Sequence, residues 1–309
     1  MEINRFSFLI QAKEDISLPP FKGPALRGGL GHALKKIVCI YSGPCKEDDC
    51  PVRKNCVFKR LFEPKEGGRN IPAPYLIEPP LDGKRHYRPG EEIRFHLVLF
   101  GNAVNYLPYF IYAFEVLGEI GLGKGKGKFT LTFVSAVRED EEIGIYNGQT
   151  KMLSTKKLPI LIEDFKKGDN PSKMLIETIT PIHIELEGQT LKTVEDFCFY
   201  NLFKALLGRL STLSHFYGDK KFEWDYKGLL EAAKKVTIDE QASTISFTTI
   251  RRFSQRRKKE DLLTGIEGRL VYRGKELNTF FPYLKFGQYA HIGGRTTFGL
   301  GAYRVLKFA

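Results

Sequence analysis

The amino-acid sequence predicts an α+β protein made of two tandem ferredoxin-like (RRM-like) domains. Strand-like and helix-like patterns follow one another in the same order in both halves, and part of the first half recurs in the second. The length of 309 residues fits two domains of roughly 150 residues each. Hydrophobic residues make up 42% of the chain, which suffices for two cores and excludes a disordered or collagen-like chain.

The first half opens with a strand and a helix. Apolar side chains alternate with polar ones from Phe6 to Ile10, as on a strand, and leucines recur every fourth residue from Leu26 to Leu34, as on a buried helix face. Further along, we expect strands at 91–100 and 129–137, a helix at 106–118 and a glycine-rich loop at 121–128.

A repeat without gaps relates this region to the end of the chain. Pro108 aligns with Pro282 (282 − 108 = 174), and Gly125 aligns with Gly299 at the same offset (299 − 125 = 174). The second copy predicts a strand at 265–274, a helix at 277–290, a loop at 293–301 and a strand at 302–308. A few of the 30 glycines could align by chance, but the shared order of elements favours a duplicated domain.

The second half also opens with strand, helix and strand. Ile182, Ile184 and Leu186 alternate with polar residues, and a helix-like stretch at 194–216 and a strand-like run at 243–250 follow. Each half therefore has the β-α-β-β-α-β order of the ferredoxin-like fold. The predicted N-terminal domain spans 1–172 with a cysteine-containing insert at 39–56, and the predicted C-terminal domain spans 173–309 and carries the glycine-rich loop.

Charge favours a nucleic-acid partner. Lys and Arg number 48 against 36 Asp and Glu, giving a net charge of +12, and such an excess favours a polyanion, with nucleic acid preferred over a membrane surface. The alternative is a basic enzyme whose charge is incidental. No apolar run approaches the ~20 residues of a membrane-spanning helix, and residues 1–11 lack the layout of a signal peptide. We therefore expect a cytoplasmic protein without a membrane partner.

Three basic segments could hold RNA. The loop GLGKGKGKF alternates glycine with lysine, the loop HIGGRTTFGLG is similarly glycine-rich, and RRFSQRRKK (251–259) adds Phe253 as a stacking ring. Glycine lets a backbone approach a phosphate closely, although such glycines often only turn the chain and charge runs are often solvated faces. The predicted RNA-binding residues are Arg27, Lys36, Lys124, Lys126, Lys128, Arg251, Arg252, Arg256, Arg257, Gly293, Gly294, Arg295, Thr296, Gly299 and Gly301.

The C-terminal HIGGRTTFGLGAYRV resembles the glycine-rich signature of the CRISPR-associated endoribonucleases that process pre-crRNA, within the RAMP superfamily. FKGPALRGGLGHALKKIVC (21–39), FEP (62–64), YLIEPP (75–80), LVLFG (97–101) and TPIHIELEG (180–188) are similar to the other landmarks and stand in the same order. The resemblance implies RNA bound at or near the cleft between two RRM-like domains. It also implies cleavage within the CRISPR repeat RNA, without a metal or other catalytic cofactor, to give mature crRNA.

Two other functions remain open at this point. One is a non-catalytic RAMP subunit that binds crRNA together with other CRISPR effector subunits. The other is a nucleic-acid adaptor held together by zinc. The sequence leaves open whether the protein is a monomer or a homodimer.

RNA cleavage without a metal is an attack by the 2′-hydroxyl on the adjoining phosphate, which leaves a 2′,3′-cyclic phosphate and a 5′-hydroxyl. It needs a base, a donor for the leaving oxygen and fixed positive charge. Histidine suits the first role because it changes its charge near neutral pH, and the candidates are His32, His86, His96, His183, His215 and His291.

We select His32 as the base. On its predicted helix it lies outside the face formed by the leucines, and Lys35 and Lys36 follow one turn later. The resemblance also implies a base on or near the first helix, where it often lies in this superfamily. His291, directly before the C-terminal glycine loop, is a second candidate, unless it shapes that loop. Lys35 and Tyr41 are expected to orient the substrate or share proton transfer.

Cys39, Cys45, Cys50 and Cys56 have the spacing C-x5-C-x4-C-x5-C. Four cysteines in a cysteine-poor chain could hold a structural zinc ion or, failing that, an iron–sulfur cluster. The spacing lacks the C-x2-C pair of most zinc sites, so a disulfide pair or buried thiols are the alternatives. We expect any such metal to be structural.

Overall fold

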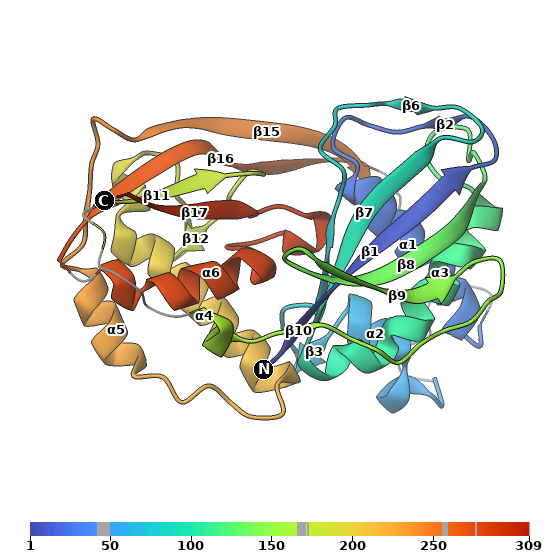
Figure 1. Ribbon diagram of the computed structural model, residues 1–309, viewed down its shortest axis with the longest axis horizontal. Helices are drawn as coiled ribbons and strands as arrows, with labels where there is room; N and C mark the ends of the chain where they lie inside the picture. The colour runs from blue at the N-terminus through green and yellow to red at the C-terminus, as the bar shows by residue number, and fades with distance from the viewer. Residues whose placement is uncertain (42–49, 166–170, 172, 255–258, 276, 309) are drawn as a thin grey trace. The chain divides into compact units, whose positions relative to one another are not determined.

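The computed structural model describes the chain apart from residues 42–49, 166–170, 172, 255–258, 276 and 309. It divides into two compact units, which we call the N-terminal unit (Asn4–Pro159) and the C-terminal unit (Met1–Ile3 with Ile160–Ala309). Each unit combines helices with an antiparallel sheet (Figure 1). Among the described residues, no helix is long and apolar enough to cross a membrane.

The N-terminal unit is built on a sheet with the strand order β5-β7-β1-β8-β9. Its main elements are β1 (Ile3–Ala12), α1 (Gly23–Val38), α2 (Val57–Phe62), β5 (Tyr75–Glu78), β7 (Glu92–Phe100), α3 (Leu107–Ile120), β8 (Phe129–Arg138) and β9 (Glu141–Asn147). Short strands are β2 (Ile16–Ser17), β3 (Lys65–Glu66), β4 (Arg69–Asn70), β6 (His86–Tyr87) and β10 (Pro159–Ile160), and 3-10 turns span Arg53–Asn55 and Gly101–Tyr106.

The core of this unit lies between the sheet and helices α1 and α3 (Figure 1). The alternating residues of β1 that face it, Phe6 and Phe8 among them, are fully buried, and the Phe8 ring stacks on Phe95 with centroids 5.4 Å apart. Gly118 lets α3 approach β8, because a Cβ there would lie 2.3 Å from the Phe129 carbonyl oxygen. The predicted strand, helix and apolar faces of this half are confirmed.

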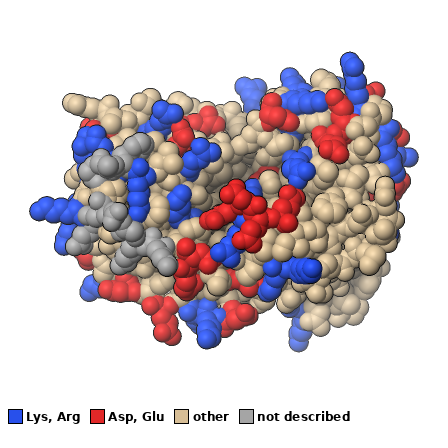
Figure 2. Space-filling view, in the orientation of Figure 1, with Lys and Arg blue, Asp and Glu red and all other residues tan. Residues whose placement is uncertain are grey.

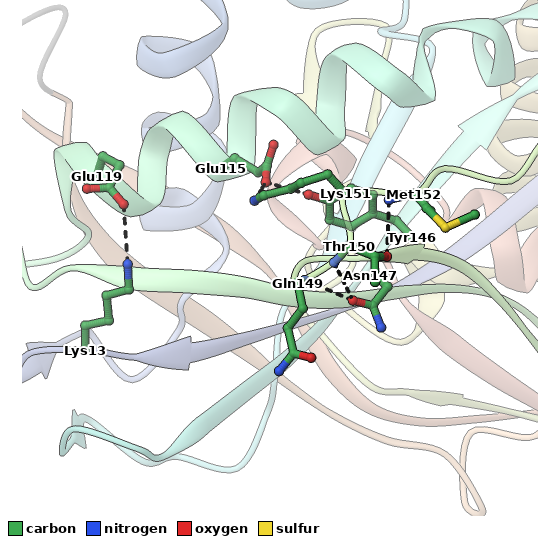
Figure 3. A network of polar contacts seen from close by, with 9 residues as sticks. All are labelled: Lys13, Glu115, Glu119, Tyr146, Asn147, Gln149, Thr150, Lys151 and Met152. Carbon is green, nitrogen blue, oxygen red and sulfur yellow. Dashed lines mark hydrogen bonds and ion pairs between the residues drawn. The ribbon is translucent and has the colours of Figure 1, made fainter.

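A polar network fixes the far side of α3 to β9 and the turn that follows it (Figure 3). Glu115 accepts a hydrogen bond from the Tyr146 hydroxyl at 2.5 Å and forms an ion pair with Lys151. Asn147 Oδ1 caps the turn by accepting from the backbone of Gln149 at 2.9 Å. Burial, and then the Glu115 carboxylate, raise the pKa of Tyr146. The network therefore fixes the edge of the sheet in place, and we assign it no part in catalysis.

The C-terminal unit repeats the same plan. Its sheet has the order β14-β16-β11-β17, with β15 also paired to β16. The elements are β11 (Lys173–Thr178), β12 (Glu185–Leu186), β13 (Gln189–Thr190), α4 (Phe199–Tyr217), α5 (Tyr226–Ala233), β14 (Thr237–Ile238), β15 (Thr244–Ser254), β16 (Lys259–Arg273), α6 (Phe281–Ala290) and β17 (Tyr303–Phe308). Further 3-10 turns span Ile162–Asp164, Glu195–Phe197, Leu277–Thr279 and Thr296–Phe298.

The repeat seen in the sequence is confirmed at the level of elements. Helices α3 and α6 begin at Leu107 and Phe281 (281 − 107 = 174), and strands β8 and β17 begin at Phe129 and Tyr303 (303 − 129 = 174). Four strands also match in order, because β15-β16-β11-β17 in one unit corresponds to β5-β7-β1-β8 in the other.

The first strand of the C-terminal unit differs from the expectation. It is β11 rather than the run 182–186, of which Glu185–Leu186 pairs with β13. Strand β11 lies between β16 and β17 and buries both faces, so its Met-Leu-Ile run is continuous and shows no alternation. The units also divide after Pro159, before the predicted boundary at 172; Phe165 stacks on Tyr289 of α6 at 6.2 Å, which ties this segment to the C-terminal unit.

Candidate nucleic-acid interface

Helix α1 presents the predicted base. Leu26, Leu30 and Leu34 are buried, whereas His32 and Lys36 are exposed on the other side of the helix. Two glycines allow α1 to pack closely against its neighbours. A Cβ at Gly29 would lie 2.8 Å from a Leu117 methyl carbon, and one at Gly31 would lie 2.7 Å from the Phe62 ring. The glycine-rich opening therefore serves packing, and it leaves the His32 face open.

The end of α1 gathers the remaining predicted catalytic groups of this unit. Lys35 and Lys36 lie in the last turn, where positive charge also suits the helix dipole. Tyr41 follows the helix and is half-buried. Helix α1 thus carries an imidazole and two ammonium groups, and their catalytic role stays a prediction.

Arg27 does not lie on this open face. It is half-buried, with its guanidinium over the Phe62 ring at 5.0 Å from the centroid. Burial raises the pKa of Tyr75 to about 12, and the charge of Arg27 partly opposes that rise. Its placement favours a packing role inside the N-terminal unit over the predicted contact with RNA.

The glycines of the loop 121–128 mostly approach the protein's own backbone. A Cβ at Gly123 would lie 2.1 Å from the Ser17 carbonyl oxygen, and one at Gly127 would lie 2.2 Å from that of Asp15. The backbone N–H of Lys124 donates to the same Ser17 oxygen at 3.0 Å. The loop is therefore anchored on the segment around β2, which corrects the expectation that these glycines admit a phosphate.

The lysines of this loop remain available for RNA. Lys124, Lys126 and Lys128 are all exposed. Gly125 has a φ of +90° and open space around its Cα, so it serves the turn alone. The loop presents three ammonium groups on a backbone that internal contacts hold in place.

His291 is directed into the C-terminal loop rather than toward solvent. Its side chain is 1% exposed, and its Nδ1–H donates to the Leu300 carbonyl at 2.9 Å. Its backbone has a φ of +59°. Of the two alternatives that the sequence left open, the geometry favours a residue that shapes the loop over a reactive acid or base.

The glycines of the loop 293–301 are likewise part of a scaffold. A Cβ at Gly293 would lie 2.1 Å from the His183 carbonyl oxygen, which also accepts from Gly294 N–H at 2.7 Å. Buried Thr180 donates from Oγ1 to the Gly299 carbonyl at 2.7 Å, and Gly301 N–H donates to the Pro181 carbonyl at 2.9 Å. These contacts hold the loop against residues 180–183.

Arg295 is the member of this loop that the structure offers to a ligand. It is exposed, in a left-handed backbone conformation with a φ of +59°, whereas Thr296 is buried. The predicted RNA contacts at Thr296 and at the four glycines Gly293, Gly294, Gly299 and Gly301 are therefore better explained as the support of Arg295.

His183 lies beside this loop, although it was not selected among the six candidate histidines of the sequence. Its Nδ1 lies 3.3 Å from Thr264 Oγ1. Partial burial, and then the charge of Arg295, lower the pKa of His183, so its imidazole is neutral near pH 7 and can bond a base edge or a hydroxyl. The TPIHIELEG landmark is the sequence signal that points to it.

The hairpin of β15 and β16 carries the third basic segment. Arg251 and Phe253 are exposed on one face of β15. Arg252 points the other way: it forms an ion pair with Asp261 at 2.5 Å and lies 4.5 Å over the Phe298 ring, so its expected contact with RNA is replaced by a structural one. Arg256 and Arg257 lie outside the described residues.

The face of β15 that holds Arg251 also holds an aromatic platform. Phe247 is 43% exposed, and the Lys192 ammonium lies 5.5 Å from its ring centroid. Exposed rings beside cations are the combination that single-stranded nucleic acid uses for stacking and charge neutralisation.

The cysteine group is described in part. Cys39, Cys50 and Cys56 are half-buried free thiols, and Cys45 lies outside the described residues. Within the described part of the chain, no three His, Cys, Asp or Glu side chains gather as metal ligands. The metal therefore stays a prediction.

Two family models match the chain. Residues 1–158 match the AF_1859_N N-terminal domain, and residues 176–303 match the CRISPR-associated endoribonuclease Cas6. An uncharacterized protein of Archaeoglobus fulgidus is 26% identical over 299 residues, which cover 93% of this chain and 92% of that protein.

Solved structures share the fold. A Cas6 product complex has a TM-score of 0.58 at 13% identity over 99% of each chain, and Thermus thermophilus Cas6 has a TM-score of 0.55 at 11% identity over 99% of this chain and 98% of that one. A partial Cas6-RT-Cas1–Cas2 complex has a TM-score of 0.60 at 12% identity over 99% of this chain. This chain spans 46% of the chain matched there, about half its length.

Proposed function

Because this chain belongs to the Cas6 family of CRISPR-associated endoribonucleases, we propose that it cleaves CRISPR repeat RNA to mature crRNA without a catalytic metal. The equivalent strand orders of the two sheets support a pair of ferredoxin-like RNA-binding domains. The exposure of His32 on α1 beside Lys36 is the observation that carries the proposal, since it provides a base that RNA can reach.

In the proposed reaction, the neutral imidazole of His32 takes the proton of a ribose 2′-hydroxyl. The resulting oxyanion attacks the adjoining phosphorus, and the P–O5′ bond breaks in line with the attack. Negative charge builds up on the phosphate oxygens as it does so, and Lys35 and Lys36 on the same helix supply positive charge to offset it. The departing O5′ takes up a proton from water, so the products are a 2′,3′-cyclic phosphate and a 5′-hydroxyl, and His32 returns its proton to water afterwards.

Binding is assigned to exposed groups apart from the base. Lys124, Lys126 and Lys128 of one loop, Arg295 of the other, and Arg251 of the hairpin contact phosphates, while Phe247 and Phe253 stack on bases. This division separates affinity from chemistry, because a neutral imidazole adds little to phosphate binding.

The test is cleavage of CRISPR repeat RNA by His32→Ala in the presence of a chelator. General-base catalysis contributes about 10²–10⁴-fold, so we expect a rate loss of that order, with RNA affinity nearly unchanged. His215→Ala is the matched control, because His215 is also exposed on a helix and has no assigned role. A wild-type protein that binds repeat RNA tightly but leaves it intact would be the non-catalytic RAMP subunit, and normal cleavage by His32→Ala would reassign the base.

We also propose a structural zinc ion at the four cysteines, which does not take part in cleavage. The proposal rests on their grouping in the sequence and predicts about one zinc per chain in purified protein. Cys39→Ser should release the metal and leave the cleavage rate per folded molecule unchanged, whereas metal-free native protein would contradict it.

A further inference from the structure

A second basic site lies at the end of the C-terminal sheet. Strands β14 and β16 end beside a hollow, which we call the β14–β16 hollow, lined by Lys235, Thr237, Arg273, Gly274 and Lys275. Its three cationic side chains are exposed. On the face drawn in Figure 2, Lys and Arg side chains lie among Asp and Glu side chains.

The charge of this hollow is positive on balance. Arg273 is paired with Asp239, at 2.7 Å from Nε and 2.5 Å from Nη2, and that hydrogen bond is the main reason that the pKa of Asp239 is lowered. Lys173 lies opposite Arg273 on β11 and its charge acts on the same carboxylate. Among the described residues, three cations (Lys235, Arg273 and Lys275) line the hollow, and Arg273 is the one that Asp239 pairs with.

The donors around the hollow suit a phosphate group. Lys235 and Lys275 line the hollow together with Gly274 and with Thr237, whose hydroxyl donates to the Arg273 carbonyl at 3.4 Å. A Cβ at Gly274 would lie 3.2 Å from the Val236 side chain, so glycine avoids a close contact there. The cationic side chains of this hollow suit the oxygens of a phosphate.

Strand β16 links this hollow to the candidate interface. Thr264 of β16 contacts His183 beside Arg295, and Arg273 stands nine residues further along the strand (273 − 264 = 9). At 3.4 Å per residue, that separation is about 30 Å. A nucleic-acid strand advances about 3.4 Å per nucleotide along a helix axis, so about nine nucleotides span the same distance.

We propose that the β14–β16 hollow binds a backbone phosphate of the RNA about nine nucleotides from the nucleotide at Arg295. The inference rests on the proposed function, which it extends from the cleavage position to a flanking segment. A phosphate on a free nucleotide has the same chemistry, and the experiment separates the two sources.

The experiment measures affinity for RNAs of different length that carry a 2′-deoxy nucleotide at the cleavage position, so that binding is read without cleavage. One series extends the RNA on the 5′ side and the other on the 3′ side, in steps from two to fifteen nucleotides. The test protein is Lys235→Ala/Lys275→Ala. The control is Lys220→Ala/Lys221→Ala, which removes two exposed lysines of the same unit that do not line the hollow.

Each single-strand phosphate contact contributes about −0.7 to the slope of log affinity against log salt concentration. At 0.1 M salt, relative to 1 M, one contact therefore contributes about five-fold in affinity and two contacts about 25-fold. We expect the test variant to lose about 5- to 25-fold in affinity for RNAs extended beyond about nine nucleotides on one side, with a shallower salt slope. Shorter RNAs should bind it as tightly as they bind the wild type.

Three results would overturn the inference. One is an equal loss in the control variant, which would indicate bulk charge, and another is a loss that does not depend on RNA length. The third is competition by millimolar inorganic phosphate or a mononucleotide as effective as that by long RNA, which would assign the hollow to a free ligand. If the wild type fails to bind repeat RNA of any length, it is the proposed function that fails.

Discussion

Two glycines in the loop 121–128 give a matched pair of substitutions that tests what the loop does. Gly123 and Gly125 both have positive φ, +77° and +90°, so alanine at either position costs about 1–2 kcal/mol for the left-handed conformation. Their surroundings differ. A Cβ at position 123 would lie 2.1 Å from the Ser17 carbonyl oxygen, whereas nothing lies within 4 Å of one at position 125.

The additional cost at position 123 follows from that contact. The carbonyl must move away, which breaks its hydrogen bond from Lys124 N–H, 3.0 Å long, at about 1 kcal/mol. Forced displacement in a packed region costs about 1–3 kcal/mol more. We therefore expect Gly123→Ala to destabilise the loop by about 2–4 kcal/mol more than Gly125→Ala does.

Hydrogen–deuterium exchange of the peptides that cover 13–18 and 121–128 measures this difference locally, and RNA affinity is measured beside it. Gly123→Ala should exchange much faster in both peptides and bind RNA more weakly, because the loop lysines lose their fixed positions. Gly125→Ala should keep near-normal affinity. Equal exchange in the two variants would refute the packing explanation. A selective loss of RNA binding by Gly125→Ala would indicate instead that this open glycine admits a phosphate.

Three further predictions concern other buried contacts. Burial lowers the pKa of His96 from 6.5 to about 4, so its contribution to stability is present above pH 6.5 and is lost as the pH falls toward 4. Between pH 7.5 and pH 5, the unfolding free energy measured in urea should therefore fall by about 2 kcal/mol less for His96→Gln than for the wild type. Equal falls in the two proteins would contradict this. Thr180→Val should cost about 1–3 kcal/mol and weaken RNA binding, because it leaves the buried Gly299 carbonyl without its donor; an unchanged unfolding midpoint would exclude that role. Asp82→Ala should destabilise the protein more than Lys22→Met does, because it leaves the fully buried Lys22 ammonium without the Asp82 carboxylate, which lies 2.7 Å away. A lower unfolding midpoint for Lys22→Met than for Asp82→Ala would refute this account.

The elements that could be predicted from the sequence are those in which buried residues recur every two residues, as on a strand, or every three to four, as on a helix. Helix α1 and strand β1 were readable because each buries one face, as the burial of Phe6, Phe8 and Leu30 shows. Strand β11 was missed because burial on both faces removes the alternation. The repeat at 174 residues was visible because both units place equivalent elements at equal distances along the chain.

The site was predicted less completely, because its contacts join residues far apart in the sequence. Gly123 meets Ser17 across 106 positions (123 − 17 = 106), and no local pattern records that approach. Arg252 and Asp261 become partners through the hairpin register, so a run of basic residues gave no sign of which side chain was already paired. The exposure of His32 could be predicted because it depends on helix periodicity alone.

The burial of His291 shows the same limit. Its position next to the glycine loop suggested a reactive group, but its side chain bonds the Leu300 carbonyl inside the loop. His183, which was not selected from the sequence, is a histidine that lies close enough to Arg295 for the Arg295 charge to lower its pKa. The position of His291 next to the loop in the sequence therefore did not indicate that its side chain is buried.

The most direct test of the central claim is the chemistry of the cut. Wild-type protein is incubated in chelator with two repeat RNAs that differ by one 2′-deoxy sugar, on the 5′ side of the scissile phosphate, and the products are weighed by mass spectrometry. The account predicts that the all-ribose RNA yields a 2′,3′-cyclic phosphate and a 5′-hydroxyl, and that the deoxy RNA stays whole. Cleavage of the deoxy RNA, or products ending in a 3′-hydroxyl and a 5′-phosphate, would contradict it.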